Sequence, residues 1–90
     1  MQLERRVVCA AIRNDDGHII CGARHYDGIM HFQILSSKEN WRKDTVEQGF
    51  IDQDGIFLTR EEAFLIATER GQIQRRVGGD SGKLFSENLY

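Results

Sequence analysis

The chain contains no proline and only two cysteines among its 90 residues. Cys9 and Cys21 lie inside apolar runs, so they offer no disulfide framework and fit a reducing compartment, where a free cysteine behaves as a small buried hydrophobe. No apolar stretch approaches membrane-spanning length, and residues 1–6 lead straight into a strand-like run. We therefore expect neither a membrane span nor a signal peptide.

The charge balance is slightly acidic, with 12 lysines and arginines against 14 aspartates and glutamates. A net charge of −2 does not attract duplex DNA, so we expect no DNA or RNA polymer as partner, although a local basic pocket can still bind a small anionic ligand. Ninety residues predict a single domain, 1–90, and a chain of this length buries only roughly 60–65% of its unfolded surface. We therefore expect a homo-oligomer, since association adds burial.

The first half of the chain predicts a β-hairpin followed by a short helix. Residues 6–12 are apolar at odd and even positions, which predicts a strand covered on both faces. Residues 14–17 read Asn-Asp-Asp-Gly, a strong turn signal, and residues 18–22 return as the second strand. Apolar residues within 23–35 roughly follow helical spacing, although Gly28 interrupts it, and a polar loop follows.

The most regular pattern covers residues 48–73, where an Asp-Gly turn closes a second hairpin and a helix follows it. Thr59 is the predicted N-cap, and Glu62 completes a capping box three residues later. Gly71 supplies the left-handed stop. The helix is apolar over 63–67, a stripe too broad to face solvent on most sides. Together the patterns predict an α+β fold, in which a small antiparallel sheet of two hairpins packs with two to three helices.

The same helix looks like half of a Nudix pyrophosphatase signature, which would make the protein an enzyme. However, Phe64, Leu65 and Thr68 stand where that signature needs arginine and magnesium-binding carboxylates. The three histidines and two cysteines match no metal-ligand spacing, and nothing in the sequence indicates an activated thiol. We therefore expect no catalytic residue, no metal site and no cofactor, and we expect that the protein is not an enzyme.

A few residues are candidates for binding an anionic ligand. Arg24 and His25 directly follow the second predicted strand, and both side chains can donate to phosphate. Arg75 and Arg76 follow the main helix and have the same capacity. Phe50 lies beside a glycine and could stack on a base, but the sequence is equally compatible with a place in the core.

Taken in order, these motifs resemble the small phage proteins of the Thoeris anti-defence (Tad) sponge family. The likeness rests on CAAI with the following Gly22-Arg24-His25, on QGF at 48–50, on TREEA at 59–63, on GQI at 71–73 and on LFSENLY at 84–90. The resemblance implies that Phe50 stacks an adenine and that Arg24 and His25 meet phosphate. It further implies that Thr59 and Arg60 hydrogen-bond the ligand and that Arg76 closes over it.

The resemblance also implies a function. Members of that family act in the host bacterial cytoplasm and sequester cyclic ADP-ribose isomers without cleaving them, and some also bind small cyclic oligonucleotides. Sequestration would block TIR-based Thoeris or CBASS-like signalling, and the family assembles as homodimers or hexamers. Two alternatives stay open: an inhibitor that binds a host protein through its apolar helix, and an enzyme that cleaves the nucleotide with His25 or a helix glutamate. The sequence fixes neither the ligand nor the choice between dimer and hexamer.

Overall fold

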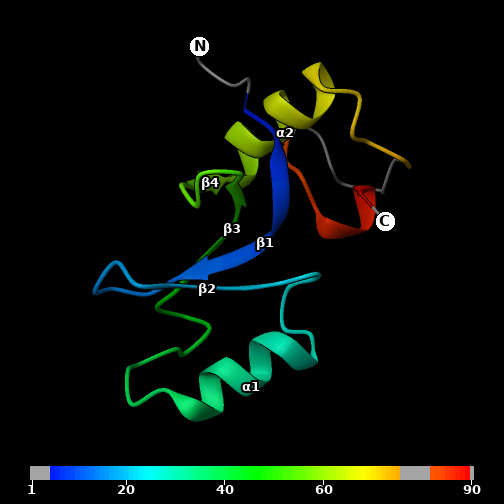
Figure 1. Cartoon of the computed structure of the whole chain (residues 1–90). Coiled ribbons are helices and arrows are strands. Elements are labelled where there is room, and N and C mark those ends of the chain that lie inside the picture. The colour runs from blue at the N-terminus through cyan, green and yellow to red at the C-terminus, as the bar shows by residue number, and fades with distance from the viewer. Residues whose placement is uncertain (1–4, 76–81, 90) are drawn as a thin grey trace.

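The computed structural model describes residues 5–75 and 82–89. The four strands form one antiparallel sheet in the order β2-β1-β3-β4 (Figure 1). The elements in chain order are β1 (Val7–Arg13), β2 (Ile19–Gly22), α1 (Gly28–Ser36), β3 (Glu47–Asp52), β4 (Phe57–Thr59), α2 (Arg60–Glu69) and the 3₁₀ turn η1 (Ser86–Asn88). The α+β fold with two hairpins, predicted from the sequence, is confirmed.

Strand β1 is one of the two central strands of the sheet, pairing with both β2 and β3. Its consecutive residues Ala10, Ala11 and Ile12 are fully buried, so both faces of the strand are covered there, as the unbroken apolar run predicts. Near its start the register shifts between Val7 and Cys9. This bulge leaves Val8 46% exposed, so the cover on both faces does not extend to the start of the strand.

Helix α1 begins later than the sequence pattern suggests. Asp27 is its N-cap, and the Asp27 carboxylate accepts the backbone N–H of Met30 at 2.9 Å. Gly28, which looks like an interruption in the sequence, is instead the first residue of the helix. The segment before it turns sharply, with Tyr26 at φ 58°, so the apolar residues of 23–27 do not belong to the helix.

The unit over 48–73 forms as predicted. The Asp-Gly turn places Gly55 at φ 78°, a conformation that glycine adopts without strain. At the start of α2, Thr59 accepts the N–H of Glu62, and the Glu62 carboxylate accepts the N–H of Thr59 at 2.9 Å. At its other end Gly71 has φ 67°. The capping box and the glycine stop are therefore both confirmed.

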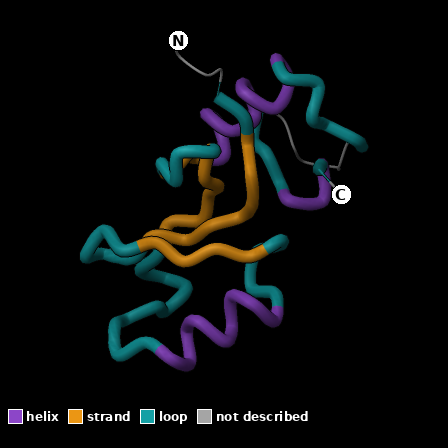
Figure 2. Tube along the Cα trace, viewed as in Figure 1, coloured by secondary structure: helices purple, strands orange, loops and turns teal. Residues whose placement is uncertain are grey.

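Two apolar clusters lie side by side along the sheet rather than in one central core. The first joins the sheet to α2 and the C-terminal segment; the second joins it to α1 and the loop that follows α1. Figure 2 shows the two α-helices at opposite ends of the molecule, with the strands between them. The first cluster contains Val7, Ala10, Phe50, Leu58, Ala63, Ala67, Leu84 and Leu89, and the second contains Ile12, Met30 and Trp41.

Two glutamine side chains extend the sheet where no strand is present. The Gln72 amide donates to the carbonyl of Val7 at 2.7 Å and accepts the N–H of Val7 at 2.9 Å. In the same way, Gln33 on α1 bonds both the carbonyl and the N–H of Cys21, at 2.5 and 3.4 Å. Each amide therefore satisfies backbone groups that a missing neighbour strand would otherwise pair.

Candidate functional site

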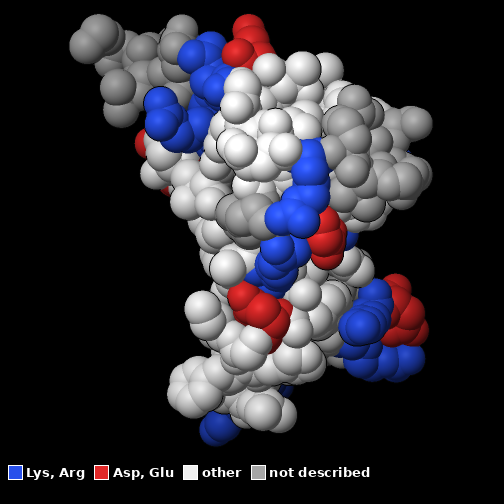
Figure 3. Space-filling view, turned by 90° about the vertical axis from the view of Figure 1, so that its right-hand side faces the viewer, with Lys and Arg blue, Asp and Glu red and all other residues white. Residues whose placement is uncertain are grey.

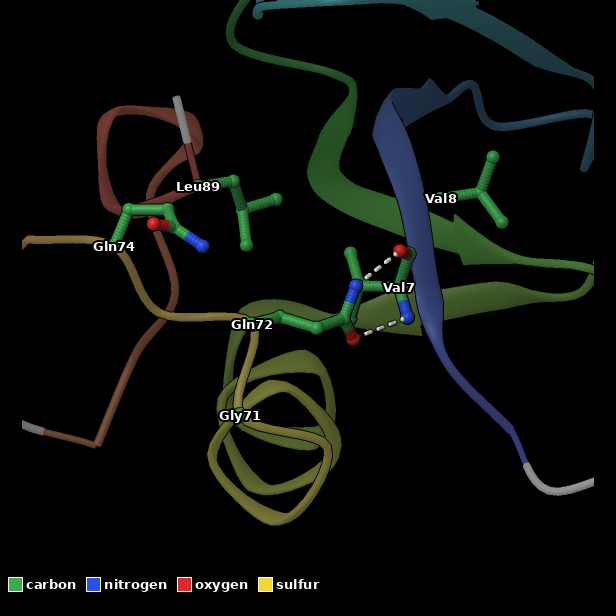
Figure 4. A pocket seen from close by; sticks show the side chains of 6 residues that line it. All are labelled: Val7, Val8, Gly71, Gln72, Gln74 and Leu89. Carbon is green, nitrogen blue, oxygen red and sulfur yellow. Dashed lines mark hydrogen bonds between the residues drawn. The ribbon is translucent and has the colours of Figure 1, made fainter.

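An open pocket of about 310 Å³ lies between the start of β1 and the segment that follows α2. Figure 4 shows Gln72 reaching across to Val7, with Gln74 and Leu89 on the other side of the hollow. The lining residues are Val7, Val8, Gly71, Gln72, Gln74 and Leu89. Ligand sites usually have apolar walls and a few polar groups that orient the ligand, whereas the exposed lining of this pocket is more polar than apolar.

The polar groups of the pocket differ in their availability. Both ends of the Gln72 amide bond the backbone of Val7, so Gln72 holds the wall in place. Gln74 is exposed, and its backbone N–H donates to the carbonyl of Asn88 at 2.7 Å, which fixes the position from which its side chain starts. An amide side chain can donate and accept at once, as the edge of a nucleobase does. Gln74 is therefore the best placed of the lining residues to read a polar ligand edge.

Positive charge is close to the pocket along the chain. Arg6, Arg70 and Arg75 are sequence neighbours of the lining residues Val7, Gly71 and Gln74 respectively. On the face shown in Figure 3, lysine and arginine side chains form a band down the middle, with acidic side chains beside it. Arginines therefore stand next to three of the lining residues in the sequence, although the whole chain is slightly acidic.

The structure brings the predicted site residues Arg24 and Arg60 to the same region, beside the C-terminal segment. Arg24 approaches Glu87 of η1 with an Nη1–Oε1 distance of 3.8 Å. Arg60 donates to the carbonyl of Leu84 at 2.7 Å and to the Gln48 amide oxygen at 2.9 Å, and its guanidinium lies 4.5 Å from the centre of the Phe85 ring. Arg60 therefore connects the C-terminal segment to α2. Its Nη1 and Nη2 groups each donate one hydrogen bond to the scaffold.

His25 also has a structural bond. Its Nε2 lies 2.7 Å from the carbonyl oxygen of Gly49, and since a carbonyl only accepts, Nε2 carries the hydrogen. Burial, followed by the nearby charge of Arg60, lowers the pKa of His25 below its ordinary value. Burial therefore disfavours the protonated ring, and in the neutral form the Nε2–H donates to the Gly49 carbonyl.

Of the other predicted residues, Phe50 and Thr59 are part of the scaffold, and Arg76 is not among the residues that the structure describes. Phe50 is fully buried in the first cluster, which resolves the choice between pocket and core in favour of the core. Its ring centroid lies 5.2 Å from that of His25 with the two planes nearly perpendicular, and because Phe50 is fully buried neither ring face is exposed to a base. Thr59 uses its hydroxyl in the capping box. Arg76 lies outside the described residues.

The C-terminal turn η1 connects the pocket with the region around Arg24 and Arg60. Glu87 of η1 faces Arg24, and Leu89, two residues on, lines the pocket. The carbonyl of Asn88 between them accepts from the N–H groups of Gln74 and Arg75, at 2.7 and 3.3 Å. Sequence reasoning missed Gln72, Gln74 and Leu89 because their relevance depends on contacts between distant segments, and only the glycine at 71 marked the place.

The described residues can also be compared with the requirements of a cation site and of a reactive thiol. Within residues 5–75 and 82–89, no three His, Cys, Asp or Glu side chains come together as a possible cation site. Cys9 and Cys21 are half-buried rather than fully buried as expected; burial, followed by the neighbouring Cys21, raises the pKa of Cys9 to about 11, so this thiol is a poor nucleophile at pH 7. No helix in the described ranges is long and apolar enough to cross a membrane.

Comparison with known proteins gives one match. The model of a family described as the phage T4 y16D protein matches residues 6–90, which is nearly the whole chain. No curated protein and no solved structure matches the chain.

Proposed function

The chain belongs to the phage T4 y16D protein family, and from this premise we propose that it is a phage anti-defence protein that sequesters a small cyclic nucleotide signal. The ligand class that we propose is the cyclic ADP-ribose isomers, with small cyclic oligonucleotides as the second class. The ligand is held and not cleaved. The proposal joins the family membership to the sponge resemblance of the sequence and to the geometry of one pocket.

The observation that carries the proposal is the pocket itself, an open hollow lined by Val8 and Leu89 and by the exposed residue Gln74, with arginines at neighbouring positions of the sequence. A base or ribose would contact Val8 and Leu89, and Gln74 would hydrogen-bond its polar edge. Phosphates would lie toward the arginines, whose planar groups bind them in pairs of hydrogen bonds. The volume is at the low end of the ~300–1,000 Å³ that ligand sites span. It therefore fits part of such a ligand, and the rest would extend over η1 toward Arg24.

Sequestration needs affinity and excess rather than chemistry. A nanomolar dissociation constant corresponds to about −12 kcal/mol, which a base contact and two phosphates can supply in a preorganised site. The bond from His25 to the Gly49 carbonyl also leaves its Nε2 engaged in the scaffold. A His25 ring whose Nε2 is bonded to the backbone is not placed to cleave a nucleotide, which is consistent with binding without cleavage.

The proposal is tested by titrating the purified protein with cyclic ADP-ribose isomers and with cyclic di- and trinucleotides in a calorimeter. After binding, the protein is denatured by heat and the released ligand is identified by mass spectrometry. Recovery of the intact cyclic nucleotide supports sequestration. Recovery of only the linear ADP-ribose product would show cleavage and overturn it, and silence across the whole panel would favour the protein-binding alternative.

A charge variant locates the site. Gln74→Glu places a carboxylate in the pocket at nearly constant shape, so an anionic ligand should bind at least tenfold more weakly. Asn40→Asp makes the same change at an exposed position of the loop after α1, at the other end of the molecule, and should leave the affinity unchanged. Equal effects of the two substitutions would mean that the ligand does not occupy this pocket.

A further inference from the structure

Helix α1 is apolar on two opposite sides. Its inner side places Met30 and Ile34 in the second apolar cluster with Trp41. Its outer side exposes three large apolar residues to 61, 72 and 84%, namely Ile29, Phe32 and Leu35. The nine residues from Gly28 to Ser36 include no Asp, Glu, Lys or Arg.

The three exposed side chains form one continuous stripe. They recur every three residues, and at 3.6 residues per turn this places Phe32 in the middle, with Ile29 and Leu35 on its two sides. The stripe lies on the side of the helix away from Met30. An apolar side of a helix is normally covered, and among the described residues the chain covers only the inner one of these two.

We propose that a second copy of this chain covers the stripe, with the two α1 helices packed antiparallel about a two-fold axis at Phe32. In such a pair each stripe meets itself, so Phe32 contacts the partner's Phe32, and Ile29 lies opposite the partner's Leu35. This interface is separate from the pocket that we propose for the ligand, and it does not depend on that proposal.

The charges around α1 suit this arrangement. Asp27 caps the N-terminus of the helix, and Lys38 follows two residues after its C-terminal end. In an antiparallel pair the N-terminal end of each helix lies beside the C-terminal end of the other, so the two helix dipoles are aligned favourably. Because the helix has no charged residue of its own, no like charges are brought together along the stripe.

The area is adequate for the centre of an interface. Since large side chains offer roughly 150–250 Å² each, the exposed fractions amount to on the order of 400 Å² per copy, about half of the ~800 Å² that each partner of a stable complex buries. The segments that flank α1 would supply the polar rim. In most interfaces a few central residues, often aromatic, contribute most of the binding energy, and the polar rim around them contributes little.

Other occupants fit the stripe less well. Helices that lie on membrane surfaces have a strongly charged polar face rich in lysine and arginine, which the nine residues of α1 lack. A host protein would have to supply an uncharged apolar groove of matching length. A second copy provides the matching surface by symmetry.

The test is analytical ultracentrifugation of the full chain over a concentration series, with Phe32→Glu and the control Leu65→Glu. Leu65 is a similarly exposed apolar residue, 70% exposed, but it lies on α2. We expect the wild type and L65E to form dimers and F32E to weaken dimerisation by at least about 30-fold, the loss typical of a central interface residue. Circular dichroism checks that each variant is folded, and Leu35→Glu serves as a second probe.

Three results would overturn the proposal. One is a wild type that stays monomeric at every concentration, and another is a dimer that L65E disrupts as strongly as F32E. The third is a monomer that binds anionic vesicles or a host protein through Phe32.

Discussion

At the scale of single residues, Asp52 shows how one buried carboxylate holds a turn. Its side chain is only 1% exposed at the end of β3, where it accepts the N–H groups of Asp54 and Ile56 at 2.9 and 3.0 Å. The Nε of Arg5 donates to its other oxygen at 3.0 Å. Burial by itself would raise the pKa of Asp52, but the bonds from Ile56, Arg5 and Asp54 outweigh it and hold the pKa below its usual range.

We therefore expect Asp52→Ala to lower the free energy of unfolding by about 1–3 kcal/mol at pH 7, because it removes the acceptor of two part-buried backbone N–H groups and the partner of the half-exposed Arg5. Asp54→Ala, in the exposed part of the same turn, is the control and should cost little.

The loss at Asp52 should depend on pH. A carboxyl whose folded pKa is depressed adds stability above its unfolded pKa of about 4, and this contribution disappears as the pH falls toward the folded pKa. Urea unfolding at pH 7 and pH 3 measures it: the gap between wild type and D52A should narrow at pH 3. A gap that is constant or wider at pH 3 would contradict the assignment.

At the scale of elements, the start of α2 depends on Thr59. The Thr59 hydroxyl accepts the N–H of Glu62 at 3.1 Å, so Thr59→Ala leaves that donor without its cap. We expect a loss of about 1 kcal/mol in the free energy of unfolding, measured by chemical denaturation. Thr68→Ala, the same substitution at an exposed position of the same helix, should cost nothing because alanine has the higher helix propensity.

The same variant separates a structural role of Thr59 from the ligand contact that the sponge resemblance implies. With its hydroxyl used in the capping box, T59A should keep its affinity for any cyclic nucleotide that the wild type binds. A large loss of affinity with unchanged stability would instead assign Thr59 to the ligand site.

At the scale of the whole molecule, the two apolar clusters are joined through β1, since Ala10 belongs to one and Ile12 to the other. Leu84 of the C-terminal segment is fully buried in the first cluster. We expect Leu84→Ala to cost about 2–4 kcal/mol, because it opens a cavity between the segment and the sheet. Leu65→Ala, on the exposed side of α2, should change stability by no more than about 0.5 kcal/mol.

Trp41 reports whether the molecule unfolds as one unit. It is the single tryptophan of the chain and lies in the second cluster, away from Leu84. If the shared strand couples the clusters, L84A shifts the urea midpoint of Trp41 fluorescence as much as that of circular dichroism. A fluorescence midpoint that stays at the wild-type value would mean that the two clusters unfold separately.

Particular residues show where prediction from the sequence succeeds and where it fails. The cap at Thr59 and the stop at Gly71 follow from local rules, and both are present. The predicted start of α1 was wrong. The pair Asp27-Gly28 is compatible with a turn as well as with a helix cap, and only the fold selects the cap. Phe50 could belong to a pocket or to the core, and burial between α2 and the C-terminal segment decides for the core.

The sequence by itself determined the two hairpins and the cap and stop of α2, because each depends on residues within a few positions of one another, and these elements gave the α+β class. The tertiary structure alone decided which polar side chains are used by the scaffold. His25, Arg60 and Gln72 bond groups 24, 24 and 65 residues away along the chain. Their partners are chosen when distant segments pack together, and that packing also forms the pocket and leaves the outer side of α1 uncovered.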